Sequence, residues 1–295
     1  KYLLLTVILQ AVFWFLWGFR LKMIASYIGY QIPLGYACKI SLASAFLAAI
    51  TPSSAGGEPL RVKMLADAGA NYGEASAAVL AERVLDAIYF AIALPVFLFL
   101  SGISTSFGMK VAIIFIVSLA GFLLISYRMF KSEEDIGRIS RFFYKILSKI
   151  KGEEFGRKWS TRLENEMISF RRAAVELLRN PVHRIILLLA STALLWTSIF
   201  LIPSLILLSL HSEPNFLLSY TAQLIIIVIS LIPLTPGASG IAEAGAAYLY
   251  SMFVPQHILG VLIGLWRVMT YHLSMLVGFI VNIHLLKNYA NAKQL

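Results

Sequence analysis

Residues 51–58 read Thr51-Pro52-Ser53-Ser54-Ala55-Gly56-Gly57-Glu58, and a related stretch reads Thr235-Pro236-Gly237-Ala238-Ser239-Gly240-Ile241-Ala242-Glu243. Each stretch follows an apolar run and precedes an arginine inside another apolar run, Arg83 in the first case and Arg267 in the second. The offsets between equivalent positions agree to within one residue, since 235 − 51 = 184, 243 − 58 = 185 and 267 − 83 = 184. This agreement predicts an internal repeat whose two units each contain a Thr-Pro break.

The composition indicates an integral membrane protein. Of the 295 residues 59% are hydrophobic and 14% are charged, whereas soluble domains have about 25% charged residues. Several runs exceed the ~18 apolar residues that identify a bilayer-spanning helix, and their length favours helices over the alternating strands of a barrel. We therefore predict an all-α polytopic membrane protein, located as a multi-pass protein in the cell (plasma) membrane.

The same composition disfavours several classes of function. A single cysteine, Cys38, excludes an intrachain disulfide framework and a cysteine-ligated zinc site. We find no metal-ligand spacing, no glycine-rich nucleotide loop and no prominent Ser-His-Asp arrangement, so we predict no metal, no cofactor, no catalytic residues and no enzymatic activity. The net charge of +10 is concentrated beside the spans. At that position the basic residues are expected to bind anionic lipid head groups and not nucleic acid.

The apolar runs predict the positions of the spans. The first, Tyr2–Phe19, is expected to end at Arg20 and Lys22. The run before the first break, Tyr36–Ile50, corresponds to about 22 Å of helix and is short of the ~30 Å hydrocarbon core, so it is a candidate half-span. The other predicted spans and motif-flanking runs are Ala75–Leu100, Lys110–Tyr127, Val182–Leu210, Phe216–Leu234, Ile241–Phe253 and Gln256–Leu286.

A basic segment divides the chain. Residues 128–181 contain 13 Lys or Arg against 8 acidic residues. Apolar residues recur at helical spacing among these charges, which predicts either an amphipathic helix on the membrane or a solvated helical linker. The predicted organisation is a first membrane repeat (1–127, tip 51–58), a basic cytoplasmic linker (128–181) and a second membrane repeat (182–295, tip 235–243).

The distribution of basic residues predicts the topology. If the two apolar runs that precede the Thr-Pro motifs each crossed the membrane completely, four membrane crossings would separate equivalent positions. The two repeats would then be parallel. If each motif is instead the tip of a re-entrant hairpin, three crossings separate them and the repeats are inverted. The second arrangement places Arg20, Lys22, Lys39, the basic segment and the C-terminal tail on one side, as the positive-inside rule favours. We therefore predict two inverted repeats, each with a re-entrant helical hairpin at a Thr-Pro break.

The break residues have a physical rationale. Proline removes a backbone donor and glycine permits left-handed backbone, so both release N–H and C=O groups from helical pairing. Within the membrane such backbone must be buried in protein or line a water-filled cavity. One break in each half of the chain therefore predicts a transporter binding site. The alternative is a helix-to-helix turn at the membrane surface. The predicted break residues are Thr51, Pro52, Gly56, Gly57, Thr235, Pro236, Gly237 and Gly240.

Ionisable residues accompany both breaks. In transmembrane segments such groups cost about 2.5–3.5 kcal/mol each and usually face a cavity or a partner. The nearly equal spacing of 25 and 24 positions predicts the pairs Glu58–Arg83 and Glu243–Arg267, in which the glutamate holds an arginine that presents forked donors to a phosphate. The alternative is that the pairs are closed and only attach the hairpins to the bundle. Arg61 adds positive charge beside the first hairpin, where lipid head groups could also meet it.

The motifs at residues 51–61, 81–86 and 235–245 resemble the flippase-like transmembrane family, typified by the membrane region of the lysylphosphatidylglycerol synthases, or multiple peptide resistance factors. The resemblance covers essentially the whole chain. It implies movement of a modified phospholipid between leaflets, and stand-alone members occur beside glycolipid or polyprenyl-phosphate pathways. Ser53 stands where the family often has glycine, and the aminoacyl-transferring domain is absent, so a stand-alone member without lipid synthesis is expected. With the residues carried over from the family motifs, the predicted substrate-binding set is Glu58, Arg61, Arg83, Asp86, Glu243 and Arg267.

These features together predict a flippase or a scramblase-like lipid translocator. Its substrate is expected to be an anionic phospholipid, an aminoacylated phospholipid or a polyprenyl-phosphate-linked lipid, and its partners are membrane lipids with anionic head groups. A lipid-modifying synthase or a glycosyltransferase is a second candidate partner. The alternative functions are a small-solute or ion secondary transporter of the same architecture, and a membrane scaffold for a lipid or glycan synthase.

Overall fold

A computed structural model describes residues 1–51, 56–102, 106–129, 133–231 and 235–292. Within these ranges every regular element is helical, which confirms the predicted all-α class. The helices are α1 (Tyr2–Tyr27), α2 (Leu34–Ile50), α3 (Gly57–Asp67), α4 (Tyr72–Ser101), α5 (Ser106–Met129), α6 (Glu133–Lys151), α7 (Glu153–Arg179), α8 (Val182–Phe200), α9 (Ile202–Ser209), α10 (Phe216–Ser230), the 3₁₀ turn η2 (Pro236–Ala238), α11 (Ile241–Tyr250), α12 (Gln256–Arg267), the π-helical segment η3 (Val268–His272) and α13 (Leu273–Ala292).

Four helical segments in the described residues are long and apolar enough to cross a bilayer. They are Tyr2–Tyr27, Tyr72–Ser101, Val182–Ser209 and Gln256–Lys287. Three shorter apolar helices accompany them, over Leu34–Ile50, Met109–Ile125 and Phe216–Ser230. These lengths and compositions are those of a helical membrane protein.

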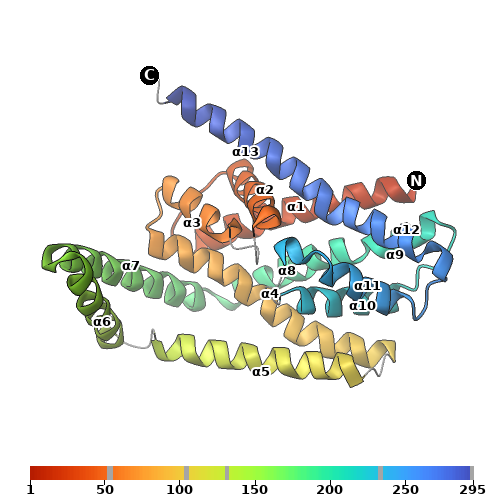
Figure 1. Cartoon of the computed structure of the whole chain (residues 1–295), viewed down its shortest axis with the longest axis horizontal. Coiled ribbons are helices and arrows are strands. Elements are labelled where there is room, and N and C mark those ends of the chain that lie inside the picture. The colour runs from red at the N-terminus through yellow and green to blue at the C-terminus, as the bar shows by residue number, and fades with distance from the viewer. Residues whose placement is uncertain (52–55, 103–105, 130–132, 232–234, 293–295) are drawn as a thin grey trace.

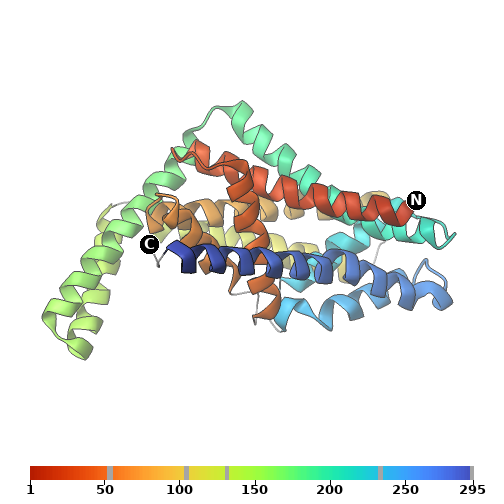
Figure 2. The same cartoon turned by 90° about the horizontal axis from the view of Figure 1, so that it is seen from above.

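Most of these helices share one direction. In Figure 1, α1, α4, α5, the α8–α9 pair and the α12–α13 pair run roughly along the long axis of the molecule. Helix α2 runs across α1 and α13 instead, as Figure 2 shows, and it packs against both. Helices α6 and α7 form a hairpin at one end of the bundle, and they occupy the segment predicted as the basic linker.

The first break follows α2. Thr51 leaves the helical region at φ −104° and ψ 145°, and its hydroxyl donates to the Leu47 carbonyl at 2.6 Å while accepting the Gly56 N–H at 2.9 Å. The predicted break residue Pro52 lies outside the described residues. Helix α3 begins at Gly57, so Gly57 and Glu58, predicted as part of the tip, are its first helical residues.

The second break follows α10. Gly237 has φ 56° and Gly240 has φ 86°, values in the left-handed region that favours glycine. The Thr235 hydroxyl donates to the Ser239 carbonyl at 2.8 Å. The Glu243 carboxylate accepts the Gly240 N–H at 2.6 Å and so caps the first turn of α11. Both Thr-Pro stretches therefore interrupt helices, and in both a threonine hydroxyl bonds to the interrupted backbone.

The predicted end of the first span is wrong. Arg20 and Lys22 do not close α1, because the helix continues to Tyr27. Arg20 is only 1% exposed inside the bundle. The physical reason is that its charge is met by carboxylates of α4, so the arginine has no need to reach the membrane surface.

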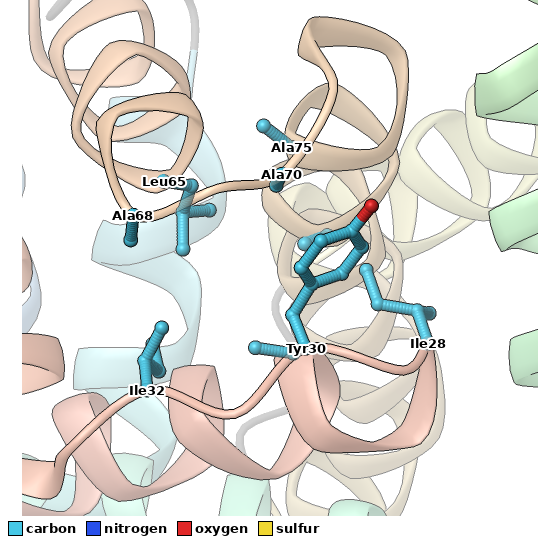
Figure 3. A pocket seen from close by; sticks show the side chains of 9 residues that line it. Ile28, Tyr30, Ile32, Leu65, Ala68, Ala70 and Ala75 are labelled. Carbon is cyan, nitrogen blue, oxygen red and sulfur yellow. The ribbon is translucent and has the colours of Figure 1, made fainter.

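Two apolar cores lie on either side of a polar layer. One is built from α1, α2, α3 and the first half of α4, and the other from the second half of α4 with α9, α10, α11 and α12. Within the first core, a cavity of about 10 Å³ lies between Ile28, Tyr30 and Leu65 (Figure 3). That volume suffices for about one water molecule, so this cavity is a packing defect and not a candidate binding site.

Candidate functional site

A cavity of about 520 Å³ is lined by residues from both halves of the chain and borders the second of these cores. Both Thr-Pro motifs contribute to its wall, the first through Glu58 and the second through Thr235 and Gly237. Aromatic side chains form much of the remainder, namely Phe13, Trp17, Trp196, Phe200, Trp266 and Tyr271. Of the predicted substrate-binding residues, the cavity wall contains Glu58, Arg83, Asp86 and Arg267.

The predicted pair Glu58–Arg83 is present in the cavity wall. Arg83 Nε donates to a Glu58 oxygen at 2.8 Å, and Nη2 forms an ion pair with the same oxygen at 2.8 Å. Its Nη1 donates to an Asp86 oxygen at 3.2 Å. The Arg83 side chain is 42% exposed and that of Glu58 is 39% exposed, so this pair is open to the cavity and is not sealed in the protein.

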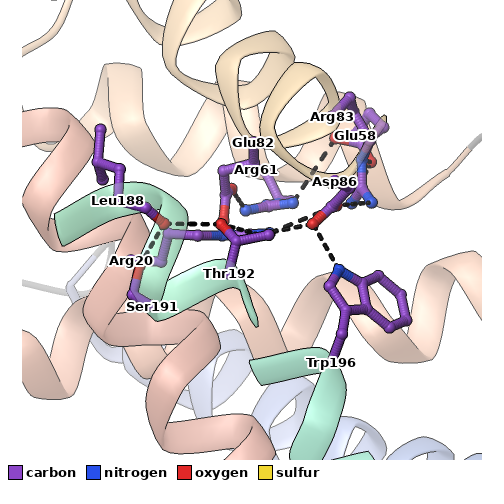
Figure 4. A network of polar contacts seen from close by, with 10 residues as sticks. All are labelled: Arg20, Glu58, Arg61, Glu82, Arg83, Asp86, Leu188, Ser191, Thr192 and Trp196. Atoms are coloured by element: carbon purple, nitrogen blue, oxygen red, sulfur yellow. Dashed lines mark hydrogen bonds and ion pairs between the residues drawn. The ribbon is translucent and has the colours of Figure 1, made fainter. Parts of the chain in front are cut away.

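Behind this pair lies a buried ionic layer, drawn in Figure 4. Arg20 of α1 donates to Glu82 at 3.3 Å and to Asp86 at 2.6 Å. Its Nη1 also donates to the Thr192 hydroxyl of α8 at 3.2 Å. Trp196 Nε1 donates to the same Asp86 oxygen at 2.8 Å. Asp86 thus joins the buried layer to the cavity-facing pair.

Arg61 belongs to the buried layer. It is 1% exposed and pairs with Glu82, which is 0% exposed. Its guanidinium lies over the Trp17 ring, 5.3 Å from the centroid, and one nitrogen is 3.8 Å from Glu58. The sequence-based placement of Arg61 near the lipid interface is therefore wrong, because α3 packs against α4 and turns this side chain inward.

The second predicted pair, Glu243–Arg267, is also present. Arg267 forms an ion pair with Glu243, with 2.7 Å between Nε and the carboxylate oxygen. Its Nη2 donates to the Ser239 hydroxyl at 3.2 Å and to the Gly237 carbonyl at 3.5 Å. The Arg267 side chain is 11% exposed, so it is held more tightly than Arg83. The second break therefore supplies backbone and side-chain acceptors to an arginine of the last span.

Tyr271 connects the two motifs. The Arg267 guanidinium lies over its ring at 4.2 Å from the centroid, and the Tyr271 hydroxyl donates to the Ala49 carbonyl at the end of α2, at 3.0 Å. A Cβ atom at Gly237 would lie 2.5 Å from this ring. Tyr271 belongs to the π-helical η3, a type of helix that occurs often at functional sites.

The ionic groups around the cavity are balanced in charge. Four arginines pair with four carboxylates, the arginines being 20, 61, 83 and 267 and the acids Glu58, Glu82, Asp86 and Glu243. An anion that enters the cavity can therefore compete with a carboxylate for an arginine. Forked guanidinium donors suit a phosphate in that role.

Sequence reasoning missed part of this arrangement. Arg20 was assigned to a span end, and Glu82 was not selected although it directly precedes Arg83 in the motif. The signal available for Glu82 was a charge in the early turns of an apolar span. Thr192 and Trp196 carried no comparable signal, because neither is charged. Among the described residues no group of three or more His, Cys, Asp or Glu could hold a metal ion.

Comparison with known proteins gives two matches. The family model described as the lysylphosphatidylglycerol synthase TM region matches residues 1–278. A protein of Archaeoglobus fulgidus named UPF0104 membrane protein is 49% identical over 287 residues, which cover 97% of this chain and 87% of that protein. No solved structure matches. On the family match over nearly its whole length, the chain belongs to the lysylphosphatidylglycerol synthase transmembrane-region family.

Proposed function

We propose that this protein translocates a lipid with a phosphate-containing head group between the leaflets of the membrane. The observation that carries the proposal is that one cavity brings together Arg83 and Arg267, each paired with a glutamate and each accompanying one Thr-Pro break. The head group enters this cavity and its acyl chains stay in the bilayer. Membership of a family named for a lipid synthase membrane region supports a lipid substrate.

The arginines have two different roles, according to whether their ion pairs are exposed or buried. The Glu58–Arg83 pair is about 40% exposed on both sides, and exposed pairs contribute only about 0–1 kcal/mol. A phosphate can therefore take the place of Glu58 at small cost. Removing a partner from a buried pair costs about 3–5 kcal/mol, so Arg20 and Arg61 stay with their carboxylates and hold the site in shape.

We propose that the two halves are inverted repeats and that each break is the tip of a re-entrant hairpin. Helix α2 packs against α3 and α10 packs against α11, as hairpin arms would. In Figure 1 the α1–α2 and α3–α4 connections lie at one end of the bundle, and the α9–α10 and α11–α12 connections lie at the other. Opposed hairpins around a central site permit alternating exposure to the two leaflets.

The remaining parts of the proposal concern location and chemistry. The protein acts as a multi-pass protein of the plasma membrane and moves its lipid without covalent change. The cavity wall contains arginines and carboxylates that are engaged with one another, an arrangement suited to binding and release of a charged head group. Transport is downhill or coupled to an ion.

The test is lipid transport in reconstituted vesicles. Protein is incorporated into vesicles that contain a fluorescent phosphatidylglycerol, and the fraction of label accessible to an external reductant is followed in time. Wild-type protein should accelerate the exchange, and Arg83→Gln and Arg267→Gln should each slow it at least tenfold. Lys63→Ala, in an exposed helical pair outside the cavity wall, should exchange at the wild-type rate. Wild-type exchange by both folded arginine variants would refute the proposed site.

A further inference from the structure

Helix α6 has an apolar side that the protein does not cover. Its Ile136 and Ser140 are buried, and α6 packs against α7. Four large apolar residues remain exposed, Phe142 at 62%, Phe143 at 42%, Ile146 at 40% and Ile150 at 69%. Residues 142, 146 and 150 recur every fourth position, so they form one stripe along the helix.

A row of basic residues borders this stripe. Arg138, Arg141, Lys145 and Lys149 are all exposed, and they recur at spacings of three and four. At 100° per residue, Arg138, Lys145 and Lys149 lie beside Phe142 on the helix surface and not opposite to it. Arg138 also pairs with Asp135 at 3.1 Å. The exposed surface of α6 therefore combines an apolar stripe with adjacent positive charge, and together we call these eight residues the α6 surface.

The α6 surface follows an apolar helix closely in the chain, since α5 contains the apolar stretch Met109–Ile125. Helix α5 ends at Met129 and α6 starts at Glu133, and four residue steps reach at most about 14 Å. Figure 2 shows α6 and α7 crossing the end of the bundle at a steep angle to α1 and α13. Helix α7 is fixed in this position, since Glu166 accepts the Gly73 N–H of α4 at 2.6 Å and Ala173 is buried in the first core.

We propose that the α6 surface binds an anionic lipid bilayer surface. Its four apolar side chains enter the boundary between head groups and acyl chains, and its basic row contacts anionic head groups. An apolar stripe flanked by lysine and arginine is the pattern of interfacial helices. The lipid surface is favoured over a protein partner because α6 begins four residues after the end of α5, which contains the apolar stretch Met109–Ile125. This inference does not depend on lipid transport.

The test measures membrane contact directly in the full-length protein. A Cys38→Ala background receives a single cysteine by Ile146→Cys or Ile150→Cys, which is labelled with an environment-sensitive fluorophore. Lys145→Cys is the matched control, next to Ile146 but on the basic row. The labelled proteins are reconstituted in phosphatidylcholine vesicles with or without an equal part of phosphatidylglycerol, and lipids with quenchers in the acyl chains are added.

The proposal expects strong quenching at 146 and 150 and weak quenching at 145 in vesicles that contain phosphatidylglycerol. Each basic residue near an anionic surface contributes about 1 kcal/mol of attraction. Each charge reversal, Lys145→Glu or Lys149→Glu, should therefore lower the equilibrium constant for membrane contact about fivefold or more. Water-soluble iodide quenching all positions equally would overturn the proposal and indicate a solvated arm or a protein-docking surface. Equal acyl-chain quenching with and without phosphatidylglycerol would overturn the anionic-lipid requirement.

Discussion

Glu82→Gln tests whether the buried ionic layer holds the bundle together. Glu82 is fully buried and has two arginine partners. It forms an ion pair with Arg61 and accepts a hydrogen bond from Arg20 Nε at 3.3 Å. Glutamine has nearly the same shape, so the substitution removes one negative charge and little volume. In this variant Arg20 retains its hydrogen bonds to Asp86 and Thr192. Arg61 retains only its ion pair with the more distant Glu58, at 3.8 Å.

The expected cost follows from the uncompensated charge on Arg61. Removing one partner of a buried pair costs about 3–5 kcal/mol, so we expect Glu82→Gln to lower the free energy of unfolding by about 3 kcal/mol. The control is Lys63→Ala, because the Lys63 side chain is 58% exposed in an i,i+4 pair with Asp67. Such pairs contribute about 0.3–0.5 kcal/mol, so Glu82→Gln should lower the free energy of unfolding roughly six to ten times as much as Lys63→Ala does.

The assay is unfolding of the purified protein in detergent, followed by circular dichroism. A third variant, Arg61→Met combined with Glu82→Gln, removes the buried positive charge as well. Because no uncompensated charge remains at position 61, this double variant should be more stable than Glu82→Gln alone. If Glu82→Gln unfolds within about 0.5 kcal/mol of wild type, or if the double variant is less stable still, the reasoning about the buried layer is refuted.

Three further substitutions test individual contacts. Gly237→Ala places a Cβ 2.5 Å from the Tyr271 ring at φ 56°, and we expect it to destabilise the protein by about 1–3 kcal/mol in thermal unfolding; Gly35→Ala, with open space around it, should be nearly neutral. Tyr271→Phe loses the hydrogen bond to Ala49 and should cost about 0.5–1.5 kcal/mol by the same measurement, so an unchanged stability would contradict this contact. Gly73→Ala places a Cβ 2.0 Å from the Glu166 carbonyl and should detach α7 from α4, which faster limited proteolysis within residues 133–179 would reveal.

Much of the fold was predictable because it depends on local properties of the sequence. The apolar runs identified the membrane class, since apolar side chains of sufficient length determine where a helix can cross a bilayer. The breaks at Thr51 and Thr235 were predictable because proline and glycine act on the backbone at their own positions. The pairs Glu58–Arg83 and Glu243–Arg267 were predictable because their members lie at nearly the same spacing, 25 and 24 positions, and both pairs occur in the structure.

The less predictable parts depend on how distant helices pack. A lysine or arginine at the end of an apolar run normally marks a membrane boundary, so Arg20 was read as the end of α1. In the structure its partners come from α4 and α8, 62 to 172 positions away in sequence. Arg61 was misplaced for the same reason, because nothing local to α3 shows that Glu82 and Trp17 lie beside it.

The sequence by itself determined the membrane class and the four residues of the two glutamate–arginine pairs, because composition and residue spacing can be read from the chain directly. Only the tertiary structure decided which of these charges face a cavity and which are sealed behind it. Glu58 and Arg83 are about 40% exposed, whereas Arg20, Arg61 and Glu82 are buried. The physical reason is that exposure depends on helix packing, and the packing also brings Tyr271 to Ala49 across 222 positions of the chain and so joins the two Thr-Pro motifs.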